Sequence, residues 1–418
     1  MRRRLGASAL IVALSLGSAA CAAIFGFEEL GSENYKVEDS SVPEVTTPDA
    51  GDAAIDNAVK DPCSELGIPD KPSLVDGGAA EDRQIVVAIN TFDIGFTTPA
   101  GFNLDRTCSP TRDKSSCVPG GSVTDFDEFG KDTDSVGTDN AGFPLLKTVG
   151  AFGGGFEPTE INKRLREGEF GAVIRITKWN GGDEDPDVVV ELFPAFGVDV
   201  NDGTGNFVRK TNKVDGGFVS DDRWLRDRRF QGISGVSTQF TLNAWVTKGR
   251  VYGRFNKLTV PVSVPDDAKP LDLVLNEAVF SAKIVPDGSR FRLTDGVVGG
   301  RVATKDFLGN VRTIYVLDNN GVKDAFICSS GTLGPTLYSV VKGKVCAARD
   351  IRSVDDPDRT KGCDAFSVGF RLDSYVLTND VYYSDENGFF DAGPDATAPR
   401  CVTNSDIPEN DDCPPAAP

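Results

Sequence analysis

Apolar and polar positions alternate through the middle of the chain. Short runs rich in Val, Ile, Thr and aromatic residues are separated by Gly, Asn or Asp, and between residues 240 and 295 they recur about every ten residues. An alternation with a period of two is typical of a half-buried β-strand. The pattern predicts strands at 84–90, 170–177, 187–195, 240–247, 250–255, 258–264, 271–277, 279–285, 290–295 and 311–317.

This spacing favours an antiparallel fold over alternating strand and helix units. We predict a mainly β protein, an antiparallel β-sandwich similar to a jelly roll, with one or two short helices. Helical periodicity occurs over residues 160–168, where Ile161 and Leu165 are four positions apart. It recurs over residues 334–350, where Pro335 stands near the first turn and apolar residues follow on one face.

An apolar run lies ahead of the first predicted strand. Three arginines precede residues 5–16, which form an apolar segment of about a dozen residues, and residues 17–20 are small. A secretory signal peptide has this arrangement, whereas a transmembrane helix needs about 20 apolar residues. We assign residues 1–20 to a signal peptide, with a short uncleaved anchor as the alternative.

Cys21 follows the small residues directly. The sequence Ala19-Ala20-Cys21 resembles the lipobox of bacterial lipoproteins, in which the cysteine is acylated and becomes the new N-terminus. Ser18 departs from the usual Leu, and Ser18-x-Ala20 also suits an ordinary signal peptidase. The resemblance implies lipidation at Cys21 and attachment to a membrane, because two or more acyl chains bind a bilayer stably.

The chain contains nine cysteines, an odd number. Without Cys21, eight remain, enough for four disulfides in an oxidising compartment. Short spacing favours Cys108–Cys117, followed by Cys346–Cys363 and Cys401–Cys413, and elimination leaves Cys63–Cys328. The chain has neither a CxxC motif nor a histidine, so we expect no zinc site.

Acidic charge is concentrated at the two flanks of a chain whose net charge is −19. Residues 22–61 contain ten acidic and two basic residues, and residues 380–418 contain nine acidic and one basic. Such composition buries too little apolar surface to fold. We predict that 21–61 holds the lipidation site and a disordered acidic tether, that 62–379 is an extracytoplasmic β-rich domain (one large or two smaller), and that 380–418 is an acidic, Cys-containing tail. An acidic protein of this kind lacks the basic surface that nucleic-acid binding needs.

The absence of histidine limits the chemistry further. It excludes Ser-His-Asp and Cys-His nucleophile systems and histidine general bases. Carboxylate chemistry survives, as in a glycoside hydrolase, which needs two carboxylates at a set separation. No pair can be selected from the sequence, so the catalytic residues are unknown and a role without catalysis is favoured.

Residues 126–142 form the densest acidic stretch. Asp132, Asp134, Asp139 and Asn140 carry the hard oxygen ligands that Ca²⁺ prefers. The stretch departs from the EF-hand pattern, with Val136 at the third ligand position. Calcium is the one cofactor considered, against a plain solvated loop. A weaker acidic loop contains Asp385, Asn387 and Asp391.

Two tryptophans mark candidate ligand sites. Trp179 ends a predicted strand at a Gly-Gly turn, where an exposed indole can stack on a sugar. Trp224 stands among arginines, including Arg226, a combination that can recognise an anionic or sugar ligand. The structural alternatives are a half-buried strand end for Trp179, and a self-neutralising loop with a buried Trp224, because aspartates are interleaved.

These features together resemble uncharacterised bacterial surface lipoproteins. The shared elements are the short signal, Cys21 followed by an acidic DAGDAA-type spacer, a β-rich body and the cysteine segment 327–367. The resemblance implies an outer membrane or cell-surface location and no particular activity. We expect a non-enzymatic binding or structural protein that contacts carbohydrate or an envelope protein, with a carboxylate-based glycoside hydrolase or lyase as the alternative.

Overall fold

The computed structural model describes most of the β-rich part of the chain. Contacts separate residues 1–57 from a second unit, Ala58–Pro418, and every described residue belongs to the second unit. The described residues are 62–73, 82–94, 100–132, 137–153, 158–168, 170–201, 204, 207–209, 219–230, 232, 236–262, 271–311, 315–317, 323–326, 334–356, 358–378, 382–383 and 412–415. The predicted signal peptide (1–20) and the segment 21–61, with the predicted lipidation site Cys21, lie outside them.

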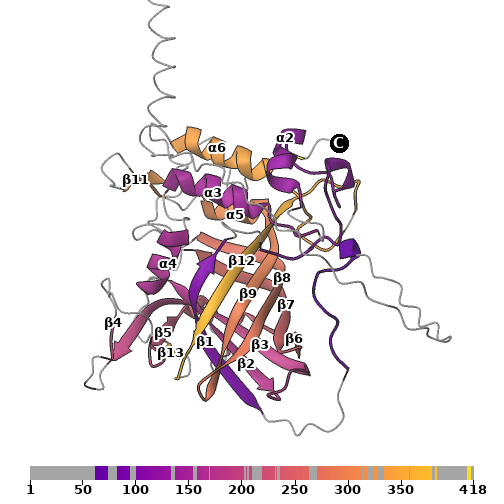
Figure 1. The fold of residues 1–418 in the computed structure, drawn as a ribbon. Coiled ribbons are helices and arrows are strands. Elements are labelled where there is room, and N and C mark those ends of the chain that lie inside the picture. Colours follow the sequence, from indigo (N-terminus) through magenta and orange to yellow (C-terminus); the bar gives the residue numbers. More distant parts are fainter. Residues whose placement is uncertain are drawn as a thin grey trace, which may run out of the picture. The chain divides into compact units, whose positions relative to one another are not determined.

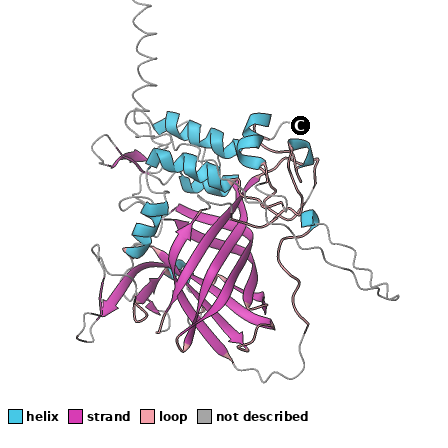
Figure 2. Ribbon diagram, viewed as in Figure 1, coloured by secondary structure: helices cyan, strands magenta, loops and turns pink. Residues whose placement is uncertain are grey.

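Eight antiparallel strands close into a β-barrel (Figures 1 and 2). In order around the barrel they are β1 (Arg83–Asp93), β2 (Gly171–Trp179), β3 (Asp185–Asn201), β6 (Phe240–Thr247), β7 (Arg250–Val262), β8 (Leu271–Asp287), β9 (Arg290–Ala303) and β12 (Ala365–Val376). Strand β12 pairs with β1 and completes the circle. Outside it, β4 (Phe207–Arg209) and β5 (Arg223–Arg226) pair with the second half of β3, β13 (Tyr382–Tyr383) pairs with β5, and β10 (Tyr315–Leu317) pairs with β11 (Lys323–Phe326).

The barrel shows that the predicted β-sandwich is wrong. Closure depends on β3, which pairs with β2 along one edge and with β6 along the other, where Val188 lies opposite Ala244. The sheet therefore never separates into two layers. An alternating pattern gives each strand one buried face in either architecture, and it does not say which distant strands pair.

Several strands are longer than predicted. The two strands expected within 250–264 form the single strand β7, and the two expected within 271–285 form β8. The residues between the predicted strands, Asn256 and Lys257 in β7 and Ala278 in β8, lie within the continuous strands, and the β8–β9 ladder shifts its register between Asn276 and Val279. Strand β12 was not predicted, and of the expected strand at 311–317 the described part is β10.

Helices cover one end of the barrel. Their bounds are α2 (Val123–Asp125), α3 (Gly142–Gly153), α4 (Pro158–Arg166), α5 (Thr304–Val311) and α6 (Gly334–Ala347), with short η turns at Pro62–Ser64, Arg112–Lys114, Phe126–Gly130 and Arg228–Phe230. Helices α4 and α6 confirm the two periodic segments, whereas α3 and α5 were not predicted. In Figure 1, α3, α5 and α6 lie over the barrel end and α4 lies beside β1. No described helix has the length and apolar character needed to cross a membrane.

Side chains fill the barrel. Phe92 stacks on Phe370 with ring centroids 5.0 Å apart, and at one end Trp179 meets the ring of Phe291 edge-on at 4.8 Å. A cavity of about 30 Å³ remains, with an apolar lining. Because this space is far smaller than a sugar or a peptide, any ligand of the described barrel has to bind elsewhere.

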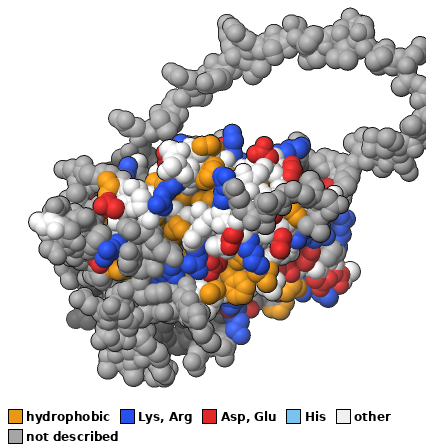
Figure 3. Space-filling model, turned by 90° about the horizontal axis from the view of Figure 1, so that it is seen from below, with side chains coloured by type: hydrophobic (Ala, Val, Ile, Leu, Met, Phe, Trp, Pro, Cys, Tyr) orange, Lys and Arg blue, Asp and Glu red, His pale blue; other side chains and the backbone are white. Residues whose placement is uncertain are grey.

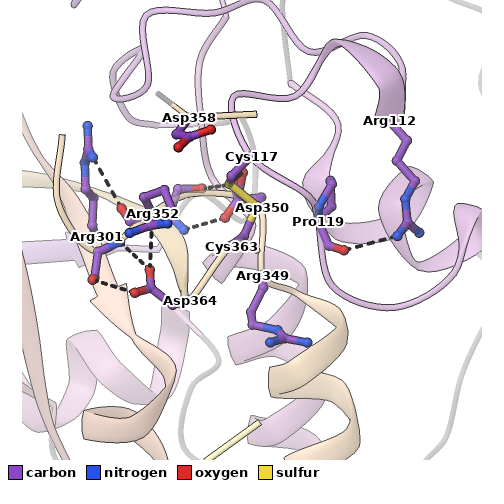
Figure 4. Close-up of a disulfide and its surroundings, with 12 residues drawn as sticks. Arg112, Cys117, Pro119, Arg301, Arg349, Asp350, Arg352, Asp358, Cys363 and Asp364 are labelled. Atoms are coloured by element: carbon purple, nitrogen blue, oxygen red, sulfur yellow. Dashed lines mark hydrogen bonds and ion pairs between the residues drawn. A yellow bond between two sulfur atoms is a disulfide. The ribbon is translucent and has the colours of Figure 1, made fainter. Parts of the chain in front are cut away.

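Disulfides join the loops beside the barrel in pairs that the sequence did not predict. The bonds are Cys63–Cys108, Cys117–Cys363 and Cys346–Cys413. The predicted pairs Cys108–Cys117, Cys346–Cys363, Cys401–Cys413 and Cys63–Cys328 are therefore wrong. Barrel closure brings residues 117 and 363 together across a separation of 246, so nearness in sequence does not decide pairing. Cys328 and Cys401 lie outside the described residues. Figure 4 shows the Cys117–Cys363 bond among charged side chains of these loops.

Candidate ligand-binding groove

A groove of about 610 Å³ separates the barrel strands from the disulfide-linked loops. Strands β6, β7 and β8 supply one side, including Phe240 and Lys257, and the loops supply Leu66, Leu104 and Arg106 on the other. Its volume is within the range of known ligand sites. A second hollow, of about 570 Å³, is lined by Arg83, Arg290 and Phe291 among others. The groove combines comparable volume with the exposed aromatic, amide and charged side chains described below.

Irregular backbone forms the floor of the groove. In the β7–β8 ladder Phe255 pairs with Ala278 and Lys257 with Asn276, whereas Asn256 and Glu277 are not among the pairs. On the other side of β8, the β8–β9 ladder shifts its register between Asn276 and Val279. Glu277 has a φ of 48°, which non-glycine residues rarely adopt. Such bulges redirect side chains and are common beside functional sites. Here the bulge places several polar side chains in the middle of two long strands.

Arg301 organises the charges at the base of the groove. It is 3% exposed, and Nη2 donates to the carbonyl of Leu104 at 2.5 Å. Two carboxylates lie near its guanidinium: Asp355 at 3.4 Å from Nη2, and Glu277 at 3.5 Å from Nε, which makes no hydrogen bond. Asp355 also pairs with Arg106 at 2.9 Å. Both carboxylates are therefore held by arginines that line the same groove.

Arg254 and Lys257 add positive charge that these carboxylates do not neutralise. Both are exposed and line the groove, and neither makes an ion pair with any described residue. The guanidinium of Arg254 lies 5.9 Å from the ring centroid of Trp245, a weak cation–π contact. The described lining residues thus include four cationic side chains and two carboxylates, so the groove has an excess of positive charge. The net charge of the whole chain is −19.

Exposed apolar and amide side chains complete the groove. Phe240 is 47% exposed and Leu242 is 61% exposed, although both are large apolar residues. Asn243 and Asn256 contribute amides, each with a donor and an acceptor. Over the whole described surface seen from the end opposite the helices, apolar side chains are interspersed with both charge types (Figure 3). An aromatic face next to planar polar groups suits a ligand with one apolar face and many hydroxyls.

A buried carboxyl cluster of Asp105, Asp139 and Asp350 lies in the loops beside the groove. Asp139 accepts hydrogen bonds from the backbone N–H groups of Leu104 (2.7 Å) and Asp105 (3.2 Å). Asp350 accepts from the backbone N–H of Ser367 (2.8 Å) and from its hydroxyl (2.5 Å). The cluster therefore attaches the loops to one another and to strand β12.

Burial raises the pKa of each carboxyl in this cluster. For Asp350 it raises the pKa to about 7, and the nearby Asp105 adds to the shift. For Asp139 burial raises the pKa well above its ordinary value, with further contributions from Asp105, Asp350 and Asp132. The pKa of Asp105 rises through burial and is partly lowered by hydrogen bonds and by Arg301. The cluster consequently holds protons at pH values where exposed carboxyls are ionised.

The residues considered for calcium do not form a ligand shell in the described part. Asp139 is turned towards the backbone, and Asn140 donates to the carbonyl of Ala100 at 2.8 Å. Asp132 accepts from the backbone N–H of Ser109. Asp134 and the second acidic loop with Asp385, Asn387 and Asp391 lie outside the described residues. Within those residues, no three or more Cys, Asp or Glu side chains are arranged to hold a metal ion.

The structure places the two candidate tryptophans in the interior. Trp179 is 3% exposed, and its indole N–H donates to the carbonyl of Gly182 at 2.9 Å. Trp224 is 1% exposed and donates to the hydroxyl of Tyr375 at 2.5 Å. Arg226 is buried, with its guanidinium 3.8 Å from the ring centroid of Phe193. In this conformation none of the three presents a face to a ligand, which corresponds to the structural alternatives.

Sequence reasoning missed the groove residues. Its one usable signal was the polar interruption of the strand pattern at Asn256 and Lys257, which was interpreted as a break between two strands. Asn276 and Glu277 were placed at the end of the predicted strand 271–277. No protein-family model, curated protein or solved structure matches this chain. The function of the groove therefore has to be inferred from its own residues.

Proposed function

We propose that the protein is a non-enzymatic surface lipoprotein that binds carbohydrate in the groove beside β6–β8. The observation that carries the proposal is the combination of exposed Phe240, two amides and exposed cations in a groove of about 610 Å³. Sugar rings stack on aromatic faces while their hydroxyls bond to amides and cations. A lipid at Cys21 and the acidic segment after it would hold this groove at the cell surface.

Side chains cover much of the backbone where β6 and β7 diverge at the groove. The two strands pair only from Ala244↔Gly253 to Thr247↔Arg250. Beyond that point the hydroxyl of Thr241 donates to the carbonyl of Arg254 at 2.5 Å, and the amide of Gln239 donates to the carbonyl of Thr259 at 3.2 Å. Recognition by the exposed ring and amides of the groove suits a ligand rich in hydroxyls.

Hydrolysis remains the second candidate because two carboxylates line the groove. Glu277 and Asp355 both lie within 3.5 Å of Arg301 atoms. Each carboxylate is therefore paired with a cation of the protein, an arrangement that favours a structural role over contact with a substrate. A glycoside hydrolase needs one acid and one base or nucleophile. The alternative would be established if the wild type hydrolysed a bound glycan, and if Glu277→Gln still bound the glycan but no longer hydrolysed it. The protein would then be a glycoside hydrolase.

Glycan-array binding by the purified protein tests the proposal. We expect binding to at least one glycan, and a loss of about tenfold or more in affinity for Phe240→Ala, because stacking contributes roughly 1 kcal/mol or more. Val123→Ala is the control, since Val123 is 64% exposed and does not line the groove. Absence of binding to every glycan would refute the proposal, as would equal binding by wild type and Phe240→Ala.

A further inference from the structure

We propose that the groove selects acidic polysaccharides, whose sugar units carry carboxylate, sulfate or phosphate groups. This inference rests on the proposed carbohydrate binding and goes further by naming the ligand class. It starts from the charges, since Arg254 and Lys257 are exposed on β7 without an ion pair among the described residues. On a chain with a net charge of −19, a site with excess cations is opposite in sign to the whole.

The two cations lie on either side of the bulge in the groove floor. Arg254 pairs with Val279 before the irregularity and Lys257 pairs with Asn276 after it. Side chains three positions apart in a regular strand face opposite sides, but the ladder is interrupted at Asn256 and both cations line the groove. At about 3.3 Å per residue their positions lie roughly 10 Å apart, about the length of two sugar units in an extended chain. Two anionic groups on neighbouring sugars can therefore reach the two cations together.

Arg301 adds a third positive charge to the groove. It is 3% exposed and lines the groove. Its Nη atoms donate to the carbonyls of Leu104 and Arg352, and its two carboxylate neighbours, Glu277 and Asp355, lie at 3.5 and 3.4 Å. Because Arg106 lines the same groove, these two carboxylates leave Arg254 and Lys257 uncompensated among the lining residues.

The neighbouring residues separate a polysaccharide from other polyanions. Phe240 and the two amides Asn243 and Asn256 provide stacking and hydroxyl contacts that a simple acidic peptide does not use. A nucleic acid would meet the repulsion of an acidic protein outside this small groove. The combination therefore favours an anionic chain of sugars.

Binding to alginate, a polymer of uronic acids, tests the inference, with dextran as the neutral polymer and poly-glutamate as the acidic peptide. We expect the purified full chain to bind alginate at least tenfold tighter than dextran and poly-glutamate, with affinity falling as NaCl rises from 0.05 to 0.5 M. Arg254→Glu/Lys257→Glu should lose about tenfold or more in alginate affinity, because charge-assisted hydrogen bonds are strong.

The matched control is Lys283→Glu/Arg292→Glu, which makes the same change of net charge at exposed positions of β8 and β9 outside the groove. It should keep alginate affinity within about twofold.

Equal loss in both double variants, or none in the Arg254/Lys257 pair, overturns the inference. Dextran bound as tightly as alginate overturns the acidic class but leaves carbohydrate binding intact. Poly-glutamate bound as tightly overturns the sugar requirement, and absence of binding to any glycan refutes the proposed function itself. A thermal melt matching wild type confirms that each variant is folded.

Discussion

Replacing Asp350 by Asn should remove the contribution of that carboxyl to the pH dependence of stability. Burial raises the pKa of Asp350 to about 7, against 3.8 for an exposed carboxyl. The folded state therefore binds this proton more tightly than the unfolded state does. The stabilisation is fully present below pH 3.8 and is lost as pH rises through 7. A difference of about three pKa units corresponds to roughly 4 kcal/mol over that window.

Asn copies the shape of the protonated carboxyl and cannot ionise. Its amide still places an oxygen near the backbone N–H of Ser367 and a donor near the Ser367 hydroxyl, the two groups that Asp350 bonds. We therefore expect Asp350→Asn to resemble wild type at pH 4. At pH 8 it should be more stable than wild type by up to about 4 kcal/mol.

Denaturant unfolding at pH 4 to 8, followed by fluorescence of the buried tryptophans, measures the effect. Wild-type unfolding free energy should fall towards pH 8, by at most about 1.4 kcal/mol per pH unit from this one group, and the Asn variant should show a flatter curve. Asp187→Asn is the control, because Asp187 is exposed on β3. Parallel curves for wild type and Asp350→Asn would refute the reasoning, and so would an equal flattening by Asp187→Asn.

Three further outcomes follow from the fold and from the proposed lipidation. Cys117→Ser/Cys363→Ser opens a loop of 246 residues, which should lower the free energy of unfolding by about 5 kcal/mol in the chain-entropy estimate; an unchanged denaturation midpoint under non-reducing conditions would contradict this. Phe370→Ala, at a side chain 1% exposed, should cost about 3–5 kcal/mol, whereas Phe240→Ala, at 47% exposed, should change thermal stability little; calorimetry showing equal losses would contradict the assigned burial. Intact mass of the mature protein should show acyl chains on an N-terminal Cys21, and a mass without them would refute lipidation.

The strand pattern identified much of the β-structure, but it misplaced the strand boundaries in β7 and β8, the strands that line the proposed binding groove. Residues 240–247 and the two halves of β7 and β8 were each predicted as strands. Asn256 was left between the predicted strands 250–255 and 258–264, and Glu277 was placed at the end of the strand 271–277, because polar interruptions usually mark turns. In the structure the strands continue through them. A rule based on local composition cannot distinguish a bulge that lines a groove from a turn that ends a strand.

The buried carboxyl cluster shows the same limit for electrostatics. Asp132, Asp139 and Asn140 were considered as metal ligands because they are close in sequence and rich in oxygen. Their actual partners include Leu104 and Ala100, more than thirty residues away along the chain. Whether a carboxyl is exposed, binds a metal or is buried with a raised pKa depends on those partners.

The sequence by itself determined the β-rich class, the helices α4 and α6, the lack of histidine chemistry and the acidic flanks, because each follows from local pattern or composition. Tertiary structure decided the closed barrel, the disulfide pairing, the burial of Trp179 and Trp224, and the groove at Arg254 and Lys257. These features arise when segments far apart in the chain meet, as β3 meets β6. A periodic pattern states which face of a strand is buried, and only the fold states what lies against it.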